Sequence, residues 1–150
     1  MDLHNDWKEF CAQLNANGVE YLVVGAFALA FHGLPRLTAD IDVWVNPTRE
    51  NAERLTKALS EFGFPSTREQ VEEFATPGKM WRVGASSYRI DVMTAIDGVE
   101  FSEAWETKAS GDLGGVPLFY ISREHYLRNK RSTSRLKDAQ DAARLEGMSD

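Results

Sequence analysis

One stretch, residues 21–45, constrains the fold of this chain more than any other. It reads YLVVGAFALAFHGLPRLTADIDVWV, in which two apolar runs flank a segment of small residues and a loop. The second run contains Asp40 and Asp42, and residues at i and i+2 of a strand project from the same face. Two adjacent carboxylates repel each other unless a cation neutralises them. Mg²⁺, which takes oxygen ligands, would do so; a solvent-exposed edge strand with two ordinary aspartates is the alternative interpretation.

The turn between the first apolar run and the small residues is a candidate phosphate site. We expect a buried strand over Val19–Val24 and a short helix over Gly25–Phe31. The first N–H groups of a helix have no partner within it and attract anions, and a glycine at the turn lets a phosphate approach the backbone. Gly25 and Ala26 are therefore candidate phosphate-binding residues. Close packing of the helix on the sheet is the alternative explanation for the same small residues.

A third acid, Asp91, lies in another apolar run, Tyr88–Thr94, which we predict to be the second strand of a hairpin. A charge inside an apolar strand is costly unless it is paired or bound to a metal. The residues themselves leave both interpretations open, a metal ligand or a salt bridge to Arg36 or Arg89.

Hydrophobic periodicity and turn residues predict the remaining elements. The further helices expected are Asp6–Asn17, Arg49–Phe62, a short one within Pro65–Phe74, Phe101–Thr107, Arg123–Asn129 and Leu136–Leu145. The further strands expected are Lys79–Val83 and Val116–Ile121, with a glycine-rich turn at Gly111–Gly115. In the last helix, the residues expected to point inward are Leu136, Ala139, Ala142, Ala143 and Leu145.

Gly25-Ala26, separated by thirteen residues from Asp40-Ile41-Asp42, resembles the signature of the polymerase-beta-like nucleotidyltransferase superfamily. A longer set of residues resembles small bacterial proteins related to AbiEii toxin nucleotidyltransferases. That set is Val24-Gly25-Ala26, His32-Gly33, Pro35-Arg36, Thr38, the Asp-x-Asp pair, Arg89-Ile90-Asp91, Phe101–Trp105, Leu127–Arg131, Arg135–Asp138 and Asp141. The resemblance covers about residues 19–146 and has one departure. Ala26 stands where the superfamily usually has Gly or Ser, and it offers the triphosphate only a backbone N–H.

The resemblance implies an α+β fold of two layers, in which a mixed sheet of about four to five strands packs with helices. Residues 1–150 would form a single nucleotidyltransferase domain. The implied reaction moves a nucleoside monophosphate from an NTP to an acceptor hydroxyl and releases pyrophosphate. Asp40, Asp42 and Asp91 would be the catalytic residues and would bind two Mg²⁺ ions, with Mn²⁺ as a substitute. Asp91 would be the general base.

The resemblance also implies a set of substrate-binding residues: Gly25, Ala26, Arg36, Thr38, Lys130 and Lys137. The N–H groups of Gly25 and Ala26 would cradle the β- and γ-phosphates, and the two lysines would neutralise the leaving pyrophosphate. A solvated basic helix face is the alternative for the lysines. Arg36 would hold a phosphate or orient the carboxylates, with a plain surface position as its alternative.

Charge bears on the acceptor. The net charge of −6 argues against non-specific coating of nucleic acid, but the run Arg123–Lys137 has six basic residues and one acid, Glu124. Such a patch would allow RNA to dock. The resemblance suggests RNA, especially a tRNA 3′ end, or a protein hydroxyl as the acceptor, as for the toxin of a toxin–antitoxin pair with a cognate antitoxin. A small-molecule, antibiotic-type nucleotidyltransferase is one alternative. A catalytically silent nucleotide-binding or regulatory module, which Ala26 favours, is another.

Three features bear on location. Cys11 is the only cysteine, so no intramolecular disulfide and no cysteine-based zinc site can form. No apolar run approaches the roughly 20 residues that span a bilayer. The N-terminal residues are charged and unlike a signal peptide. We therefore expect a cytoplasmic protein without a membrane partner.

Overall fold

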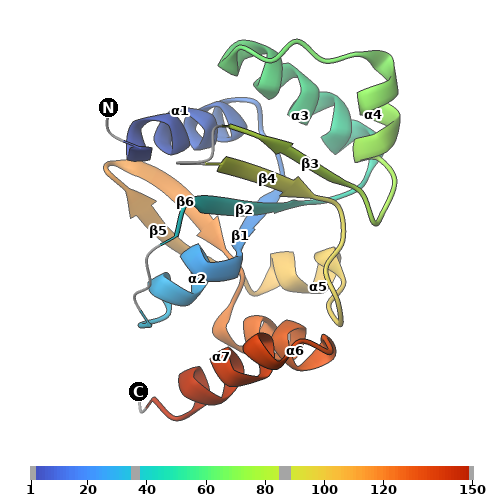
Figure 1. Cartoon of the computed structure of the whole chain (residues 1–150). Helices are drawn as coiled ribbons and strands as arrows, with labels where there is room; N and C mark the ends of the chain where they lie inside the picture. Colours follow the sequence, from blue (N-terminus) through green and yellow to red (C-terminus); the bar gives the residue numbers. More distant parts are fainter. Residues whose placement is uncertain (1–2, 35–37, 85–88, 149–150) are drawn as a thin grey trace.

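The computed structural model describes residues 3–34, 38–84 and 89–148 (Figure 1). Its strands are β1 (Tyr21–Val24), β2 (Asp40–Val45), β3 (Met80–Val83), β4 (Arg89–Met93), β5 (Ala109–Leu113) and β6 (Val116–Tyr120). Its helices are α1 (Leu3–Ala16), α2 (Gly25–Phe31), α3 (Arg49–Phe62), α4 (Arg68–Phe74), α5 (Phe101–Glu106), α6 (Arg123–Ser132) and α7 (Leu136–Glu146).

The strands form one mixed sheet in the order β3-β4-β2-β1-β6-β5. Strands β2 and β4 pair in parallel, as do β1 and β6, and the remaining neighbours are antiparallel. Helices α1, α3 and α4 lie on one side of the sheet, and α2, α5, α6 and α7 lie on the other (Figure 1). The structure confirms the α+β class with a mixed sheet, and the parallel pair β2–β4 sits near the middle of the sheet.

The sheet has six strands rather than four to five, because β5 forms where the sequence indicates a turn. The segment Ala109–Leu113 reads ASGDL, which is poor in the β-branched and aromatic residues that favour strands. Gly111 is required there by packing, since a Cβ would lie 2.6 Å from the ring of Phe31. The turn itself is shorter and consists of Gly114 and Gly115, both at positive φ.

The caps of α3 show why its predicted bounds, Arg49–Phe62, agree with the structure. The Thr48 hydroxyl accepts a hydrogen bond from the N–H of Asn51, which is a typical N-cap. At the other end, Gly63 adopts the left-handed conformation that ends many helices, with φ of 112°.

The inward face of α7 differs from the prediction. Leu136 is 73% exposed, and Ala139 and Ala143 are also exposed. The buried residues of this helix are Asp138, Asp141, Ala142 and Leu145. Asp138 is accommodated on the inward face because Thr133 and Arg135, from the connection between α6 and α7, donate hydrogen bonds to it. None of the helices in the described ranges is long and apolar enough to span a membrane.

Asn51 on α3 connects this helix to the residues that precede β1 and follow β2. Its side-chain oxygen accepts from the N–H of Glu20 at 2.7 Å, and its amide group donates to the carbonyls of Glu20 and Asn46 at 3.0 and 2.9 Å. The residue is only 3% exposed, so water cannot easily replace these bonds. Asn51 therefore fixes α3 against the start of β1 and the end of β2.

We expect Asn51→Ala to lower the free energy of unfolding by roughly 1–3 kcal/mol, because it removes three hydrogen bonds that join α3 to Glu20 and Asn46. Urea denaturation of the purified protein measures this loss. Lys57→Ala, an exposed substitution on the same helix, should change stability by less than about 0.5 kcal/mol. Equal effects of the two substitutions would show that Asn51 does not join these segments.

Candidate active site

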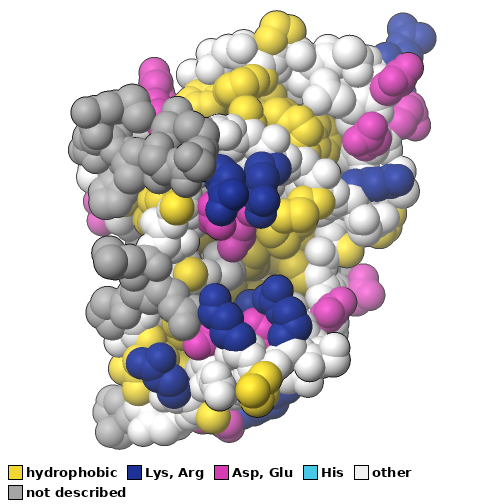
Figure 2. Space-filling view, viewed as in Figure 1, with side chains coloured by type: hydrophobic (Ala, Val, Ile, Leu, Met, Phe, Trp, Pro, Cys, Tyr) yellow, Lys and Arg dark blue, Asp and Glu magenta, His cyan; other side chains and the backbone are white. Residues whose placement is uncertain are grey.

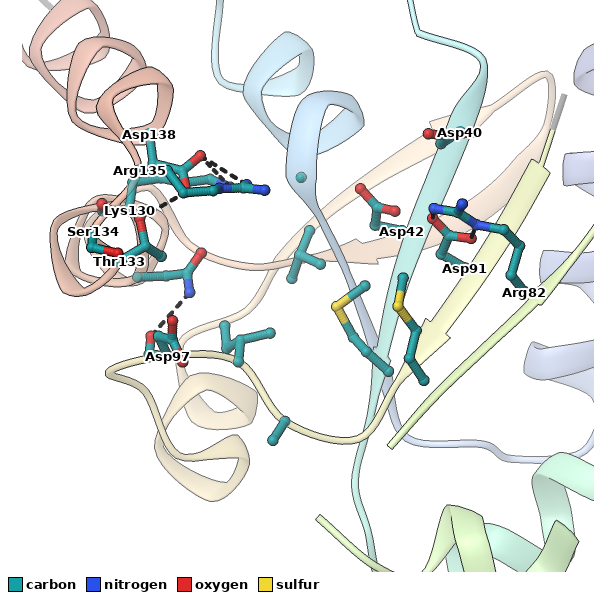
Figure 3. Close-up of a pocket in the computed structure, with 17 residues that line it drawn as sticks. Asp40, Asp42, Arg82, Asp91, Asp97, Lys130, Thr133, Ser134, Arg135 and Asp138 are labelled. Carbon is teal, nitrogen blue, oxygen red and sulfur yellow. Dashed lines mark hydrogen bonds and ion pairs between the residues drawn. The ribbon is translucent and has the colours of Figure 1, made fainter. Parts of the chain in front are cut away.

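Three aspartates meet on two neighbouring strands. In the parallel pair β2–β4, Asp42 is opposite Asp91, and Asp40 is opposite Arg89. Asp91 is 2% exposed, whereas Asp40 and Asp42 are half-buried. The side chains labelled in Figure 3 show the three carboxylates gathered on one side of a cavity. The strand alternation inferred from the sequence therefore brings Asp40, Asp42 and Asp91 together, although their catalytic and metal-binding roles remain predictions.

Asp42 bears most of the electrostatic cost of this arrangement. Burial raises the pKa of its carboxyl group to about 7, and the negative charge of Asp91, a hydrogen bond with Asp91 and the charge of Asp40 act in the same direction. The positive charge of Lys130 partly opposes the shift. A cation beside Asp42 would relieve this repulsion.

The start of α2 lies directly against Asp42. A Cβ on Gly25 would fall 2.1 Å from the Oδ2 atom of Asp42, and Gly25 has a φ of +70°. Both the close approach and the backbone conformation require glycine here. The residue before the helix, Val24, supplies no side-chain cap. Gly25 thus brings the first turn of α2 next to the carboxylates, as the phosphate hypothesis needs.

Two arginines hold the carboxylates, and only one of them was anticipated. Arg82 on β3 binds Asp91 through two bonds, Nε to Oδ1 at 2.6 Å and Nη2 to Oδ2 at 2.9 Å. Arg89 donates from Nε to Oδ1 of Asp40 at 2.7 Å. The sequence alternatives for the partner of Asp91 were Arg36, which lies outside the described residues, and Arg89. The observed register of the hairpin pairs Arg82 with Asp91, two residues away from the register that the predicted strand bounds imply, so the sequence did not point to Arg82.

The opposite wall of the cavity comes from α6 and α7 (Figure 3). Its centre is Asp138, which accepts from Thr133 Oγ1 at 2.8 Å and Arg135 Nε at 2.9 Å, while Lys130 Nζ lies 3.5 Å from its Oδ1. Burial by itself raises the pKa of Asp138, but these hydrogen bonds and positive charges outweigh it and hold the pKa at about 2. Asp138 therefore stays ionised and holds the side chain of Lys130 in place. The sequence analysis did not predict this role for Asp138.

Two adjoining cavities collect the described residues of the predicted site. The smaller, of about 160 Å³, is lined among others by Gly25, Ala26, Thr38, Asp40, Asp42, Lys130 and Lys137. The larger, of about 670 Å³, is also lined by Asp91 and has an apolar side formed by Met80, Met93, Ala95 and Ile96. In Figure 2, basic and acidic side chains gather in two groups with an apolar surface between them.

Thr38 has a local role. Its hydroxyl donates to the carbonyl of Asp40 and accepts from the N–H of the same residue, at 3.0 and 3.1 Å. It therefore shapes the entry into β2, and any contact with substrate would compete with these bonds.

The basic run of α6 and α7 is partly neutralised. Arg128 pairs with Glu103, Arg131 with Glu146, and Lys130 and Arg135 with Asp138. Arg123 donates to the carbonyl of Leu145. The surface is therefore mixed in charge, and the exposed pairs among these contribute little to stability.

Carboxylate oxygens fit a hard divalent cation by their chemistry. In the part of the chain that the structure describes, no three His, Cys, Asp or Glu side chains are already arranged around a common metal position. Arg82 and Arg89 hold two of the three carboxylates, so an ion at this cluster has to share or displace these contacts. The three carboxylates are suitable ligands for a divalent cation, and Arg82 and Arg89 would compete with that cation for two of them.

The fold has solved counterparts among nucleotidyltransferases. A candidate nucleotidyltransferase from Thermotoga maritima superposes with a TM-score of 0.57 and 18% identity over 93% of this chain and 88% of its own. An antigenic nucleotidyltransferase-like protein from Paracoccidioides brasiliensis superposes with a TM-score of 0.54 and 14% identity, over 97% of this chain and 74% of its own. ANT(2″)-Ia, in complex with adenylyl-2″-tobramycin, superposes with a TM-score of 0.55 and 15% identity, over 91% of this chain and 83% of its own.

No protein-family model matches the chain, and no curated protein matches it at a significant level. At identities this low, the structural likeness shows the fold alone, which this chain shares with these nucleotidyltransferase structures.

We expect Asp42→Asn to stabilise the metal-free protein at high pH. Because the folded-state pKa of about 7 lies above the ordinary 3.8, the folded protein binds the proton more tightly, and the wild type loses stability as pH rises from about 4 to about 7. Asparagine does not titrate, so its advantage should grow over that range and reach roughly 1–4 kcal/mol, since one pKa unit corresponds to about 1.36 kcal/mol.

Urea denaturation in chelator, between about pH 4.5 and pH 8, measures this difference. A difference between the two proteins that stays constant over the range would show that Asp42 titrates normally.

Proposed function

We propose that this chain is a metal-dependent nucleotidyltransferase that moves a nucleoside monophosphate from an NTP to an acceptor hydroxyl and releases pyrophosphate. The observation that carries the proposal is the placement of Asp42 against both Asp91 and Gly25. It joins an acid cluster to the first turn of a helix, which are the two parts needed to hold a metal and a phosphate. The fold shared with nucleotidyltransferases supports the same class.

Asp40, Asp42 and Asp91 would hold Mg²⁺, two ions in the full site, with Mn²⁺ as a substitute. The ions would supply charge neutralisation at the phosphates and activation of the acceptor hydroxyl. The chain's own contribution is to place the carboxylates on adjacent strands, half-buried, where water competes less with a cation. Asp91 remains our candidate for the general base, since it lines the larger cavity but not the smaller one beside Ala26, where the phosphates would lie.

The nucleotide would lie between α2 and the wall formed by α6 and α7. Gly25 and Ala26 would offer backbone N–H groups to the terminal phosphates, and Lys130 would neutralise their charge. Lys130 is suited to this role because its side chain is only 13% exposed and is oriented by Asp138. Lys137 lines the same small cavity and would assist.

For the acceptor, we retain RNA or a protein hydroxyl as the first proposal, as in AbiEii-related toxins that work with an antitoxin. The pairing of most of the basic run with acids makes small-molecule transfer a serious alternative. The structural likeness to ANT(2″)-Ia, whose complex contains an adenylylated aminoglycoside, supports that alternative. A silent regulatory module is the third candidate, which Ala26 and the arginine-held carboxylates favour.

The deciding experiment incubates the protein with each α-labelled NTP and Mg²⁺, together with total RNA, a protein extract or an aminoglycoside mixture. Label in one fraction identifies the acceptor class. We expect Asp42→Asn to reduce transfer to the background level, because it removes a charge from the centre of the cluster while leaving the fold intact. Transfer by Asp42→Asn at the wild-type rate would exclude the metal role, and no label from the wild type in any fraction would favour the silent module.

We expect Lys130→Ala to weaken binding of Mg·NTP roughly 10- to 100-fold, the range of a hydrogen bond to a charged group. Asp138 keeps Arg135 and Thr133 as partners in this variant, so the wall should stay folded. Isothermal titration with a non-hydrolysable NTP measures the change. Arg128→Ala, on the same helix but paired with Glu103, is the control and should bind as the wild type does. Equal weakening in both variants would mean that only general charge matters.

A further inference from the structure

Arg82 occupies the carboxylate of Asp91. Both oxygens of Asp91 accept a hydrogen bond from the same guanidinium, at 2.6 and 2.9 Å. This two-pronged geometry is the strongest form of arginine–carboxylate pairing. It also neutralises a buried charge that would otherwise lie beside Asp42 without compensation. In the structure, a positive side chain thus stands where the proposed function places a divalent ion.

Arg82 is also the partner that can leave. It lies on β3, the edge strand of the sheet, and its side chain is 50% exposed, whereas that of Asp91 is 3% exposed. The pairing of β3 with β4 is made by the backbone, so the guanidinium can rotate toward solvent while the strands stay joined. Arg89 differs, because it lies on an inner strand and is 34% exposed.

We propose that Arg82 is a resident cation of the acid cluster, and that Arg82 and a divalent ion exclude each other at Asp91. A metal and a guanidinium on the same carboxylate would repel each other in a half-buried site. Ion binding therefore releases from Asp91 the guanidinium of Arg82, a residue that lines the larger cavity. Arg82 acts through Asp91 as a positioning residue. The proposal rests on the proposed function in one respect, the use of Asp91 as a metal ligand.

The test uses the metal alone. Mn²⁺ is titrated into the nucleotide-free protein, and the dissociation constant is read from the paramagnetic resonance signal of the free ion. We expect Arg82→Gln to bind Mn²⁺ roughly tenfold more tightly than the wild type, about 1.4 kcal/mol, because the competitor is gone. Arg82→Lys, which keeps the charge but not the two-pronged geometry, should fall between them. Arg54→Gln, an arginine paired with Glu50 on α3, should match the wild type.

A second measurement guards against loss of stability in Arg82→Gln, which leaves Asp91 unpaired when no metal is present. Saturating Mn²⁺ should raise the melting temperature of Arg82→Gln more than that of the wild type, because the ion replaces the lost guanidinium. An equal or smaller rise would contradict the proposal, as would unchanged or weaker Mn²⁺ binding.

Asp42→Asn separates this proposal from the function on which it rests. If the wild type binds Mn²⁺, Asp42→Asn does not, and Arg82→Gln binds as the wild type does, then the metal site stands and the competition by Arg82 is wrong. If neither the wild type nor Arg82→Gln binds Mn²⁺, or if Asp42→Asn binds it as tightly as the wild type, both proposals are overturned.

Discussion

The repulsion among three carboxylates on two adjacent strands is the constraint on which the rest of the site depends. Parallel pairing of β2 and β4 sets Asp42 opposite Asp91 and leaves Asp40 one step away on the same face. Two of the acids are neutralised by arginines on a neighbouring strand, Asp91 by Arg82 and Asp40 by Arg89. The third, Asp42, has a raised pKa instead. A fold that needed only stability would place apolar residues there, because buried charges rarely improve stability over an apolar replacement.

The surrounding elements position two walls around this cluster. On the sheet side, Gly25 allows α2 to begin in contact with Asp42, a closeness that any other residue would prevent. On the far side, α6 and α7 come from the last third of the chain and carry Lys130 to the same cavity. Asp138 links these two helices at the cavity surface, so that one buried carboxylate both joins the helices and orients the lysine.

The sequence predicted those features that depend on residues close together in the chain. Period-two alternation placed Asp40 and Asp42 on one face, and a capped pattern gave the bounds of α3. It failed where a tertiary contact overrides the local signal. Strand β5 has weak strand propensity but pairs with β6 along its length, and the inward face of α7 includes Asp138, which has polar partners there, beside Ala142 and Leu145. Arg82 was missed because the predicted strand bounds, Lys79–Val83 and Tyr88–Thr94, set Val83 opposite Tyr88, whereas the structure pairs Val83 with Ile90 and therefore Arg82 with Asp91.

The two walls have complementary requirements, and a single ligand would meet both. Three carboxylates against Arg82 and Arg89 leave an excess of negative charge on the sheet wall, whereas Lys130 and Arg135 share one carboxylate, Asp138, on the other wall. A free divalent ion would satisfy only the first wall, and a free triphosphate would be attracted to the second and repelled by the first. Under the proposed function, a complex of metal and triphosphate carries both signs of charge in one molecule. The two walls together should therefore bind a complex of metal and triphosphate more tightly than either the metal or the triphosphate alone. This preference comes from the placement of both walls around one cavity and not from a single residue.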